Sequence, residues 1–219
     1  AKVLHPRTIR PAVARNIPVR ILSTFAPGEA GTVVMPESPS EQIKAVTALR
    51  GLILLTVDVP ELEDLAATAS AVFRVMHEQG VEILTVSQAS SRRRMTYLVD
   101  AVTGGCTWLQ QKLEEETREL EANITCREQV AVVAAVGQGA ASKTETLSRM
   151  LSVLHRANVR VLATNQQSSN VAMLAVVAEH DVARSVDAVH EAFIRPQVAT
   201  ARSRRRRRAD MIAEAVRVG

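Results

Sequence analysis

With 219 residues, the chain is long enough to bury the cores of two small domains. Hydrophobic residues make up 47% and charged residues 23%, as in an ordinary soluble protein, while aromatics at 2% argue against a stacking platform for single-stranded nucleic acid. The net charge of +4 is located in Arg202 and the arginine run 204–208, because acidic and basic residues nearly cancel elsewhere. No apolar run is long enough to span a bilayer, so we expect a cytoplasmic protein with no membrane partner.

The N-terminal segment and the two cysteines indicate how the chain is processed and whether it binds a metal. Residues 1–20 lack the apolar core of a signal peptide and do not begin with Met, which favours a fragment or a processed or trimmed chain. Cys106 and Cys126 show no metal-ligand spacing. We therefore expect free thiols, with a disulfide as the alternative, and neither a metal site nor a cofactor.

The first predicted elements form a group of strands and helices. An apolar run begins at residue 51, and the following segment repeats apolar residues every three or four positions, as an amphipathic helix does. Gly80 stands where a helix C-cap needs a left-handed residue. In chain order, we predict a strand at 51–58, a helix at 62–79, strands at 81–87 and 94–99, and a helix at 105–121. The inward face of the first helix is predicted to hold Leu62, Leu65, Ala69, Val72, Phe73 and Met76.

The second group repeats the first at a constant offset of 78 residues. VEILTVSQASS at 81–91 aligns with VRVLATNQQSS at 159–169, so that Gln88 matches Gln166. Asn158 takes the place of the capping glycine. Here we predict strands at 129–137, 159–165 and 171–178, and helices at 145–157 and 181–193. A gapless offset over this span indicates duplication.

The β-α-β-β-α order of each copy is typical of the split βαβ, ferredoxin-like plan, an α+β fold. The fourth strand of each copy is weakly signalled, and an apolar run before the repeat, such as 43–49, is a candidate edge strand. The acidic stretch 110–121 is interpreted as a solvated helix that connects the copies.

The chemistry of the chain points to recognition and away from catalysis. We find no phosphate-binding loop, dinucleotide fingerprint or nucleophile elbow, and predict no catalytic residues. Gln88 and Gln166 each follow a buried strand and precede a serine pair. An amide both donates and accepts hydrogen bonds, which suits a zwitterionic amino acid. The alternative is that each glutamine merely fills a polar turn.

Several motifs together resemble one known family. AKVLHPRT at 1–8, then IPV, a short x-x-F-x-P pattern and GT resemble the end of the kinase domain of aspartate kinases. SQASS at 87–91 and the related Q-x-S-S of the second copy resemble signature turns of that family's paired ACT domains. The resemblance implies tandem ferredoxin-like (βαββαβ) ACT domains behind a short remnant of an α/β kinase domain.

The resemblance also implies boundaries, ligands and partners. The implied parts are a kinase remnant at 1–36, a first ACT domain with a connecting helix at 43–122, a second ACT domain at 123–195 and an arginine-rich tail at 196–219. The implied contacts to an amino-acid effector, lysine or threonine, are Ser87, Gln88, Ser90, Ser91, Asn165 and Gln166. Lys2 matches a position near the nucleotide. Implied partners are a second copy joined through the ACT sheets, or a kinase subunit, and the run 43–49 is implied to be a strand donated to the second sheet.

The sequence departs from the family pattern in three places. The family's K-x-G-G kinase core is absent, so we expect no phosphoryl transfer by this chain. The turn DVPELEDLAA at 58–67 replaces a glycine-rich loop, and its acidic side chains are expected to repel a carboxylate. Three arginines, at 92–94, follow SQASS where family members often carry Glu. Effector binding by the first copy is therefore the weaker expectation.

Two other functions remain open from the sequence. The chain could be a piece of a working aspartate kinase that is active only as the whole polypeptide. It could instead be a nucleic-acid-binding adaptor that acts through the tail 202–219, because an arginine run attracts phosphates whatever the base sequence. The leading hypothesis is a regulatory, amino-acid-sensing module.

Overall fold

The structure is a computed structural model that describes residues 6–35, 42–61, 64–88, 93–139, 143–166 and 171–195. The chain divides into two compact units, at 1–42 and 43–219. Among the described residues, no helix is both long enough and apolar enough to cross a membrane. The helices are α1 (Pro6–Val13), α2 (Leu65–Glu78), α3 (Gly105–Glu116), η1 (Arg118–Leu120), α4 (Thr144–Arg156), η2 (Glu179–Asp181) and α5 (Val182–Phe193). The strands are β1 (Val19–Ile21), β2 (Thr32–Val34), β3 (Ala45–Asp58), β4 (Ile83–Gln88), β5 (Arg94–Asp100), β6 (Asn123–Val136), β7 (Ala163–Gln166) and β8 (Ala172–Ala178).

The first unit consists of α1 and a small antiparallel ribbon. Strands β1 and β2 pair over three residues, with Val19 opposite Val34. So few residues bury little apolar surface, and Phe25, between the strands, is 98% exposed. Ile17, Leu22, Val33 and Met35 are also about half exposed.

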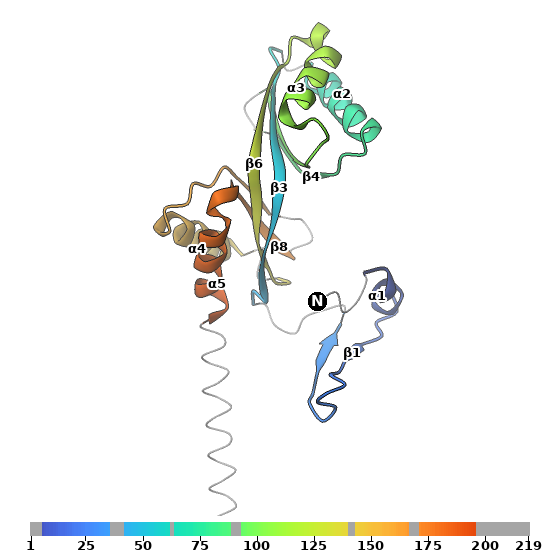
Figure 1. The fold of residues 1–219 in the computed structure, drawn as a ribbon, viewed down its shortest axis with the longest axis vertical. Coiled ribbons are helices and arrows are strands. Elements are labelled where there is room, and N and C mark those ends of the chain that lie inside the picture. Colours follow the sequence, from blue (N-terminus) through green and yellow to red (C-terminus); the bar gives the residue numbers. More distant parts are fainter. Residues whose placement is uncertain are drawn as a thin grey trace, which may run out of the picture. The chain divides into compact units, whose positions relative to one another are not determined.

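The second unit is built on one antiparallel sheet with the strand order β4-β5-β3-β6-β8-β7. Strands β3 and β6 are each 14 residues long and pair along their length. Figure 1 shows α2 and α3 beside one end of these two strands and α4 and α5 beside the other. We call these ends lobe 1 (α2, β4, β5, α3 and the β3 and β6 segments 52–58 and 123–127) and lobe 2 (α4, β7, β8, η2, α5 and the segments 45–49 and 130–136).

Each lobe has the strand order of a ferredoxin-like fold, which confirms the predicted fold class. The fourth strand of lobe 2 is the segment 45–49, where Val46 lies opposite Ala135 and Leu49 opposite Val132. The interpretation of the run 43–49 as a strand donated to the second sheet is therefore confirmed. Lobe 1 takes its own fourth strand from the first half of β6.

The duplication is visible in backbone detail. Strands β5 and β8 begin and end at residues that are 78 apart. Gly80 and Asn158, the two predicted caps, both have left-handed φ, +63° and +54°. The amide of Gly80 donates to the carbonyl of His77 at 3.1 Å, and the amide of Asn158 donates to that of His155 at 2.9 Å. The two helices therefore end in the same way.

A pair of β-bulges marks the crossing from one lobe to the other. Leu52 lies opposite Val130, and the register of β3 against β6 shifts on both sides of this pair. Gly51 has φ +71°, and Gln129 has φ +54°. These two residues are again 78 apart, so each copy contributes one left-handed residue to the crossing.

Three apolar clusters hold the second unit together. One packs lobe 2 strands against α4 and α5, with Val133, Met150 and Val189 at its centre. Another packs lobe 1 strands against α2 and α3. The third lies on the helix-free faces and joins Leu52 and Leu98 of lobe 1 to β6 and β8 residues of lobe 2. The lobes therefore share a core, which makes them one cooperative body.

Tyr97 is fully buried in the core of lobe 1. Burial raises the pKa of its phenol to about 12, because the phenolate loses hydration in an apolar surrounding. Its ring meets the Phe73 ring edge-on, with centroids 5.9 Å apart. Phe73 itself is 45% exposed, so the prediction that it lies inward on α2 is wrong, and Val75, at 1%, takes that place. The spacing rule fails because the ring covers the edge of the core from outside.

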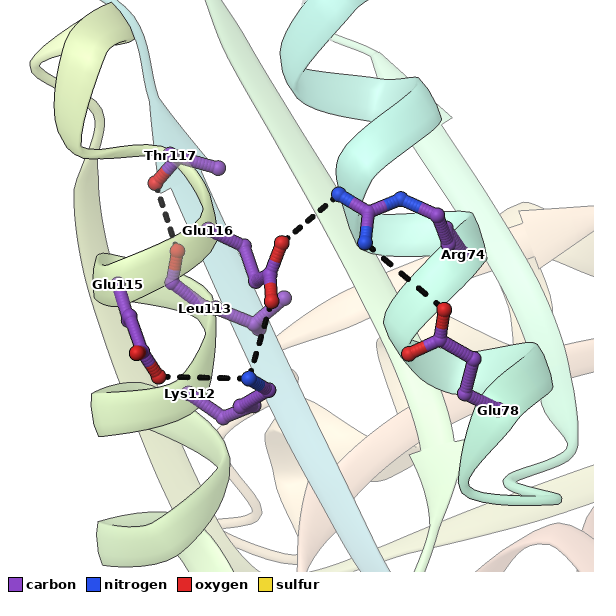
Figure 2. Close-up of polar contacts among 7 residues, drawn as sticks. All are labelled: Arg74, Glu78, Lys112, Leu113, Glu115, Glu116 and Thr117. Carbon is purple, nitrogen blue, oxygen red and sulfur yellow. Dashed lines mark hydrogen bonds and ion pairs between the residues drawn. The ribbon is translucent and has the colours of Figure 1, made fainter.

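The predicted connecting helix is α3, and it is more than a solvated link. Leu109 and Leu113 on its inner face are fully buried, so α3 is the second helix of lobe 1. Its outer face carries the acidic residues. Figure 2 shows Glu116 between Arg74 of α2 (2.8 Å) and Lys112 (2.9 Å). Hydrogen bonds from Lys112 and Arg74 lower the pKa of the Glu116 carboxyl.

The prediction of free thiols is wrong. Cys106 and Cys126 form a disulfide, with their Cα atoms 5.5 Å apart. It ties the first turn of α3 to β6, and closing a loop of this size stabilises a fold by about 3 kcal/mol in the chain-entropy picture. The amide of Cys106 also donates to Glu128 Oε1 at 2.5 Å, next to the bulge.

Substitution at the crossing tests its backbone strain. No atom lies within 4 Å of a Cβ added to Gly51, so Gly51→Ala is affected only by its φ of +71°. We expect it to lower the free energy of unfolding by about 1–2 kcal/mol, measured by denaturant titration. Gln129→Ala is the matched control, because residue 129 already carries a Cβ at a left-handed φ, and we expect less than about 0.5 kcal/mol. Equal effects at the two positions would contradict the account.

Candidate functional site

The candidate site of each lobe lies where its first strand, its edge strand and its third strand meet. In lobe 1, Ser87 and Gln88 end β4, the outermost strand of the sheet on that side. Gln88 lies opposite Met95 of β5, and both Ser87 and Gln88 are exposed. Two of the predicted effector contacts therefore stand together at an accessible strand end.

Two acidic residues at the turn of lobe 1 are paired with arginines at the start of the neighbouring strand. Arg94 Nε donates to Asp58 Oδ1 at 2.6 Å, and an Arg93 guanidinium nitrogen lies 3.6 Å from Glu61 Oε1. The amide of Val59 donates to the carbonyl of Arg93 at 2.7 Å. The hydrogen bond that Arg94 donates to the Asp58 carboxylate raises the pKa of Arg94. Two of the three departures from the family pattern thus compensate one another: the turn is paired within the lobe.

The equivalent turn of lobe 2 shares one backbone hydrogen bond with the turn of lobe 1 and has different side chains. The amide of Gly137 donates to the carbonyl of Val171 at 2.8 Å, as Val59 does to Arg93. Val136 and Ala172 stand at the positions of Asp58 and Arg94, so no ion pair can form there. Gly139 has φ +75°, which lets the backbone approach a ligand closely. This turn is neutral and retains its glycines.

The predicted contacts of lobe 2 lie on its own edge strand. Asn165 is half-buried in β7 opposite Leu174, and Gln166 is the last residue of that strand. Four strands separate β7 from β4 in the sheet, so the structure places the two glutamine sites on opposite edge strands. The repeat therefore makes two separate candidate sites.

Other predicted site residues lie outside the described part of the chain: Lys2, Ser90, Ser91 and the arginine run 202–208. Their roles stay predictions. Sequence reasoning missed the Asp58–Arg94 pair and the turn at 137–139. A signal for the second was present, because the glycines of GQG fall 78 residues after Val59 and Glu61. Within the described ranges, no group of three or more His, Cys, Asp or Glu side chains could hold a metal ion.

Comparison with known proteins identifies relatives of this arrangement. A family model described as "ACT domain" matches residues 133–193. The bifunctional aspartokinase/homoserine dehydrogenase of Haemophilus influenzae is 30% identical over 198 residues, which is 88% of this chain and 24% of that protein. The chain therefore spans about a quarter of the length of that relative.

Solved structures share the fold. Aspartokinase III of E. coli, crystallised with lysine and aspartate in the T-state, matches 88% of this chain and 42% of its own, with a TM-score of 0.64 and 24% identity. The ligand-free regulatory subunit of aspartate kinase from Thermus thermophilus matches 68% of this chain and 98% of its own, with a TM-score of 0.58 and 21% identity.

Charge exchange tests the pairing in the lobe 1 turn. Arg94→Glu sets a carboxylate against Asp58, and we expect a lower Tm because like charges then meet at the turn. The double variant Asp58→Arg, Arg94→Glu is expected to regain most of the loss, and 1 M salt to weaken both effects, since both side chains are partly exposed. A double variant as unstable as the single one would show that the pair does not hold the turn.

Proposed function

Because the chain belongs to the ACT-containing regulatory regions of aspartokinases, we propose that it binds an end-product amino acid, lysine or threonine, and thereby controls aspartate phosphorylation by a kinase domain. The observation that carries the proposal is the neutral, glycine-retaining turn after β6, at the end of the lobe 2 sheet where β7 ends with Asn165 and Gln166. The lysine complex of the related E. coli enzyme supports an amino acid as the ligand class.

Lobe 2 is the better of the two sites on physical grounds. In lobe 1, an effector carboxylate would have to compete with Asp58 for Arg94, and an effector ammonium would have to compete with Arg93 for Glu61. Lobe 2 has no such internal pair at its equivalent positions. An incoming zwitterion meets no equivalent of the Asp58–Arg94 pair there.

The groups of lobe 2 match the two charges of an amino acid. Backbone amides in a glycine turn are suited to a carboxylate, because no side chain keeps the ligand away from the peptide group. The amide oxygens of Asn165 and Gln166 are suited to an ammonium group, and their NH₂ groups to a second oxygen. In the proposal, Ser87, Gln88, Ser90 and Ser91 of lobe 1 act as a weaker or unused copy of the site.

The first unit supports association with a kinase domain. Phe25 is almost fully exposed, and four further large apolar side chains of this small unit are about half exposed. Apolar side chains at this density on a few residues mark a contact surface. We propose that this surface packs against a kinase body, whether that body belongs to the same polypeptide or to a separate subunit.

Paired substitutions test which lobe senses the effector. Gln166→Ala is expected to weaken lysine or threonine binding roughly 10- to 100-fold, because it removes a hydrogen bond to a charged ligand. Gln88→Ala, its repeat-equivalent control, is expected to leave the Kd within about twofold. Calorimetric titration of the whole chain gives both values together with a stoichiometry of about one ligand per chain.

Two results would contradict this proposal. If neither lysine nor threonine releases heat or raises the Tm of the unaltered chain, it is not a sensor of these amino acids. If Gln88→Ala abolishes binding while Gln166→Ala does not, the site lies in lobe 1.

A second copy of the chain is the other proposed partner. Strand β4 is a sheet edge, and Val86 in its middle is 37% exposed. Strand edges with exposed apolar side chains pair readily with another strand, and charge on the edge opposes this. We propose a homodimer formed through the edge of β4.

Val86→Lys tests the dimer by sedimentation at micromolar concentrations. It is expected to shift the chain toward a monomer, because a lysine on the edge must be desolvated for the strands to pair. Val171→Lys is the control, because Val171 is similarly exposed, at 40%, and lies outside the edge strands. An unaltered chain that is already monomeric would overturn this interface.

A further inference from the structure

An open cavity of about 440 Å³ lies between the helix-free faces of the two lobes, and no residue of the two turns lines it. One wall is the sheet of lobe 2, from β3, β6 and β8, and the other wall is residues 82–84 of lobe 1, at the start of β4. The lining residues are Thr47, Ala48, Leu49, Glu82, Ile83, Leu84, Val132, Ala134 and Leu174. A volume of this size is in the range of small-molecule sites.

The lining has the chemistry of an amphipathic ligand site. Leu49, Leu84, Val132, Ala134 and Leu174 are apolar, Ala48 and Ile83 pack into the helix-side clusters, and Glu82 is the single charged lining residue. The carbonyl of Glu82 accepts from the amide of Asp100 at 3.0 Å, while its carboxylate has no ion-pair partner among the described residues. Thr47 supplies a hydroxyl that both donates and accepts. A ligand with an apolar body and one cationic group complements this lining.

Comparison of the two repeat copies shows that four lining residues have chemically different equivalents in the other copy. Leu49 and Glu82 have Arg127 and Arg160 as their equivalents 78 residues later. Ala134 and Leu174 have Thr56 and Thr96 as their equivalents 78 residues earlier. In the other copy, arginine therefore stands at the positions of Leu49 and of the acidic Glu82. Threonine stands there at the positions of the apolar residues Ala134 and Leu174. The two copies have diverged most clearly in chemistry at the cavity wall.

We propose that this cavity binds a free aliphatic amino acid of the size of leucine. Its ammonium pairs with Glu82, its carboxylate accepts from the Thr47 hydroxyl, and its side chain packs against Leu49, Leu84 and Leu174. The site is separate from the effector turns proposed above and takes a different class of side chain. A ligand there contacts β4 of lobe 1 and β3, β6 and β8 of lobe 2, so it strengthens the contact between the lobes.

Ligand analogues test the role of each group in the full chain. Leucine is expected to raise the Tm and to release heat in a titration, and isoamylamine, which keeps only the cation, to bind more weakly. 4-Methylpentanoate, which is leucine without its ammonium group, is expected not to bind, because Glu82 repels a carboxylate. Binding of 4-methylpentanoate as tight as that of leucine would overturn the assignment of Glu82.

Substitutions in the wall separate this site from the turn of lobe 2. Glu82→Gln is expected to weaken leucine binding roughly 10-fold, and Ala134→Leu to abolish it by filling the cavity. Glu82→Gln changes an exposed side chain, so the test does not depend on whether Ala134→Leu folds. Gln166→Ala is expected to leave leucine binding unchanged, and Glu82→Gln to leave lysine and threonine binding unchanged. Absence of leucine binding by the unaltered chain, or unchanged binding by both wall variants, would overturn the proposal.

Discussion

The pairing of β3 with β6 is the constraint on which the rest of the second unit depends. Each of these strands serves both lobes, because one half is an inner strand of its own copy and the other half is the fourth strand of the other copy. Neither lobe is complete without the other, and the shared cluster around Leu52 and Val130 fills part of the space between their helix-free faces. Hydrogen bonds and apolar burial therefore favour the same arrangement, and separating the lobes would break both.

This constraint preserves the backbone while it leaves side chains free to diverge. The bulge residues, the helix caps and the amide-to-carbonyl bonds of the two turns recur 78 residues apart, because each is needed to continue the same strands and helices. The side chains on those turns are not needed to continue the strands and helices. Asp58 and Arg94 close one turn with an ion pair, whereas Val136 and Ala172 leave the other without charge. Duplication thus supplies two frames, and the side chains decide which of them can accept a ligand.

The sequence was sufficient for features that local chemistry determines. The 78-residue repeat, the capping role of Gly80 and Asn158, and the strand and helix order all follow from short-range patterns, and the structure has them.

Features that depend on distant partners were harder to predict. The disulfide needed Cys106 on a helix and Cys126 on a strand to meet in space, and no spacing in the sequence encodes that meeting. From the sequence, Arg93 and Arg94 were expected to weaken effector binding. In the structure they pair with Glu61 and Asp58 of the acidic turn. Phe73 fits the helical period and is nevertheless half exposed, because a large ring can cover a core from its rim.

The same strand pairing determines how a signal could pass between the lobes. The two candidate turns follow opposite ends of the β3–β6 ladder, so these two strands and the core between the lobes connect one turn with the other. The crossing is where these strands are irregular, with Gly51 and Gln129 in left-handed conformations.

Each bulge is also held by a contact to the start of a second helix. Glu128 accepts from Cys106 at the start of α3, and Glu179, before α5, accepts from the amide of Gly51 at 3.3 Å. A shift of either helix therefore acts directly on the crossing, and the disulfide makes the α3 side the stiffer of the two. On the other side, Arg50 and Gly51 donate hydrogen bonds to Glu179 before α5, and no disulfide joins the described residues there, so the α5 side lacks the covalent tie of the α3 side.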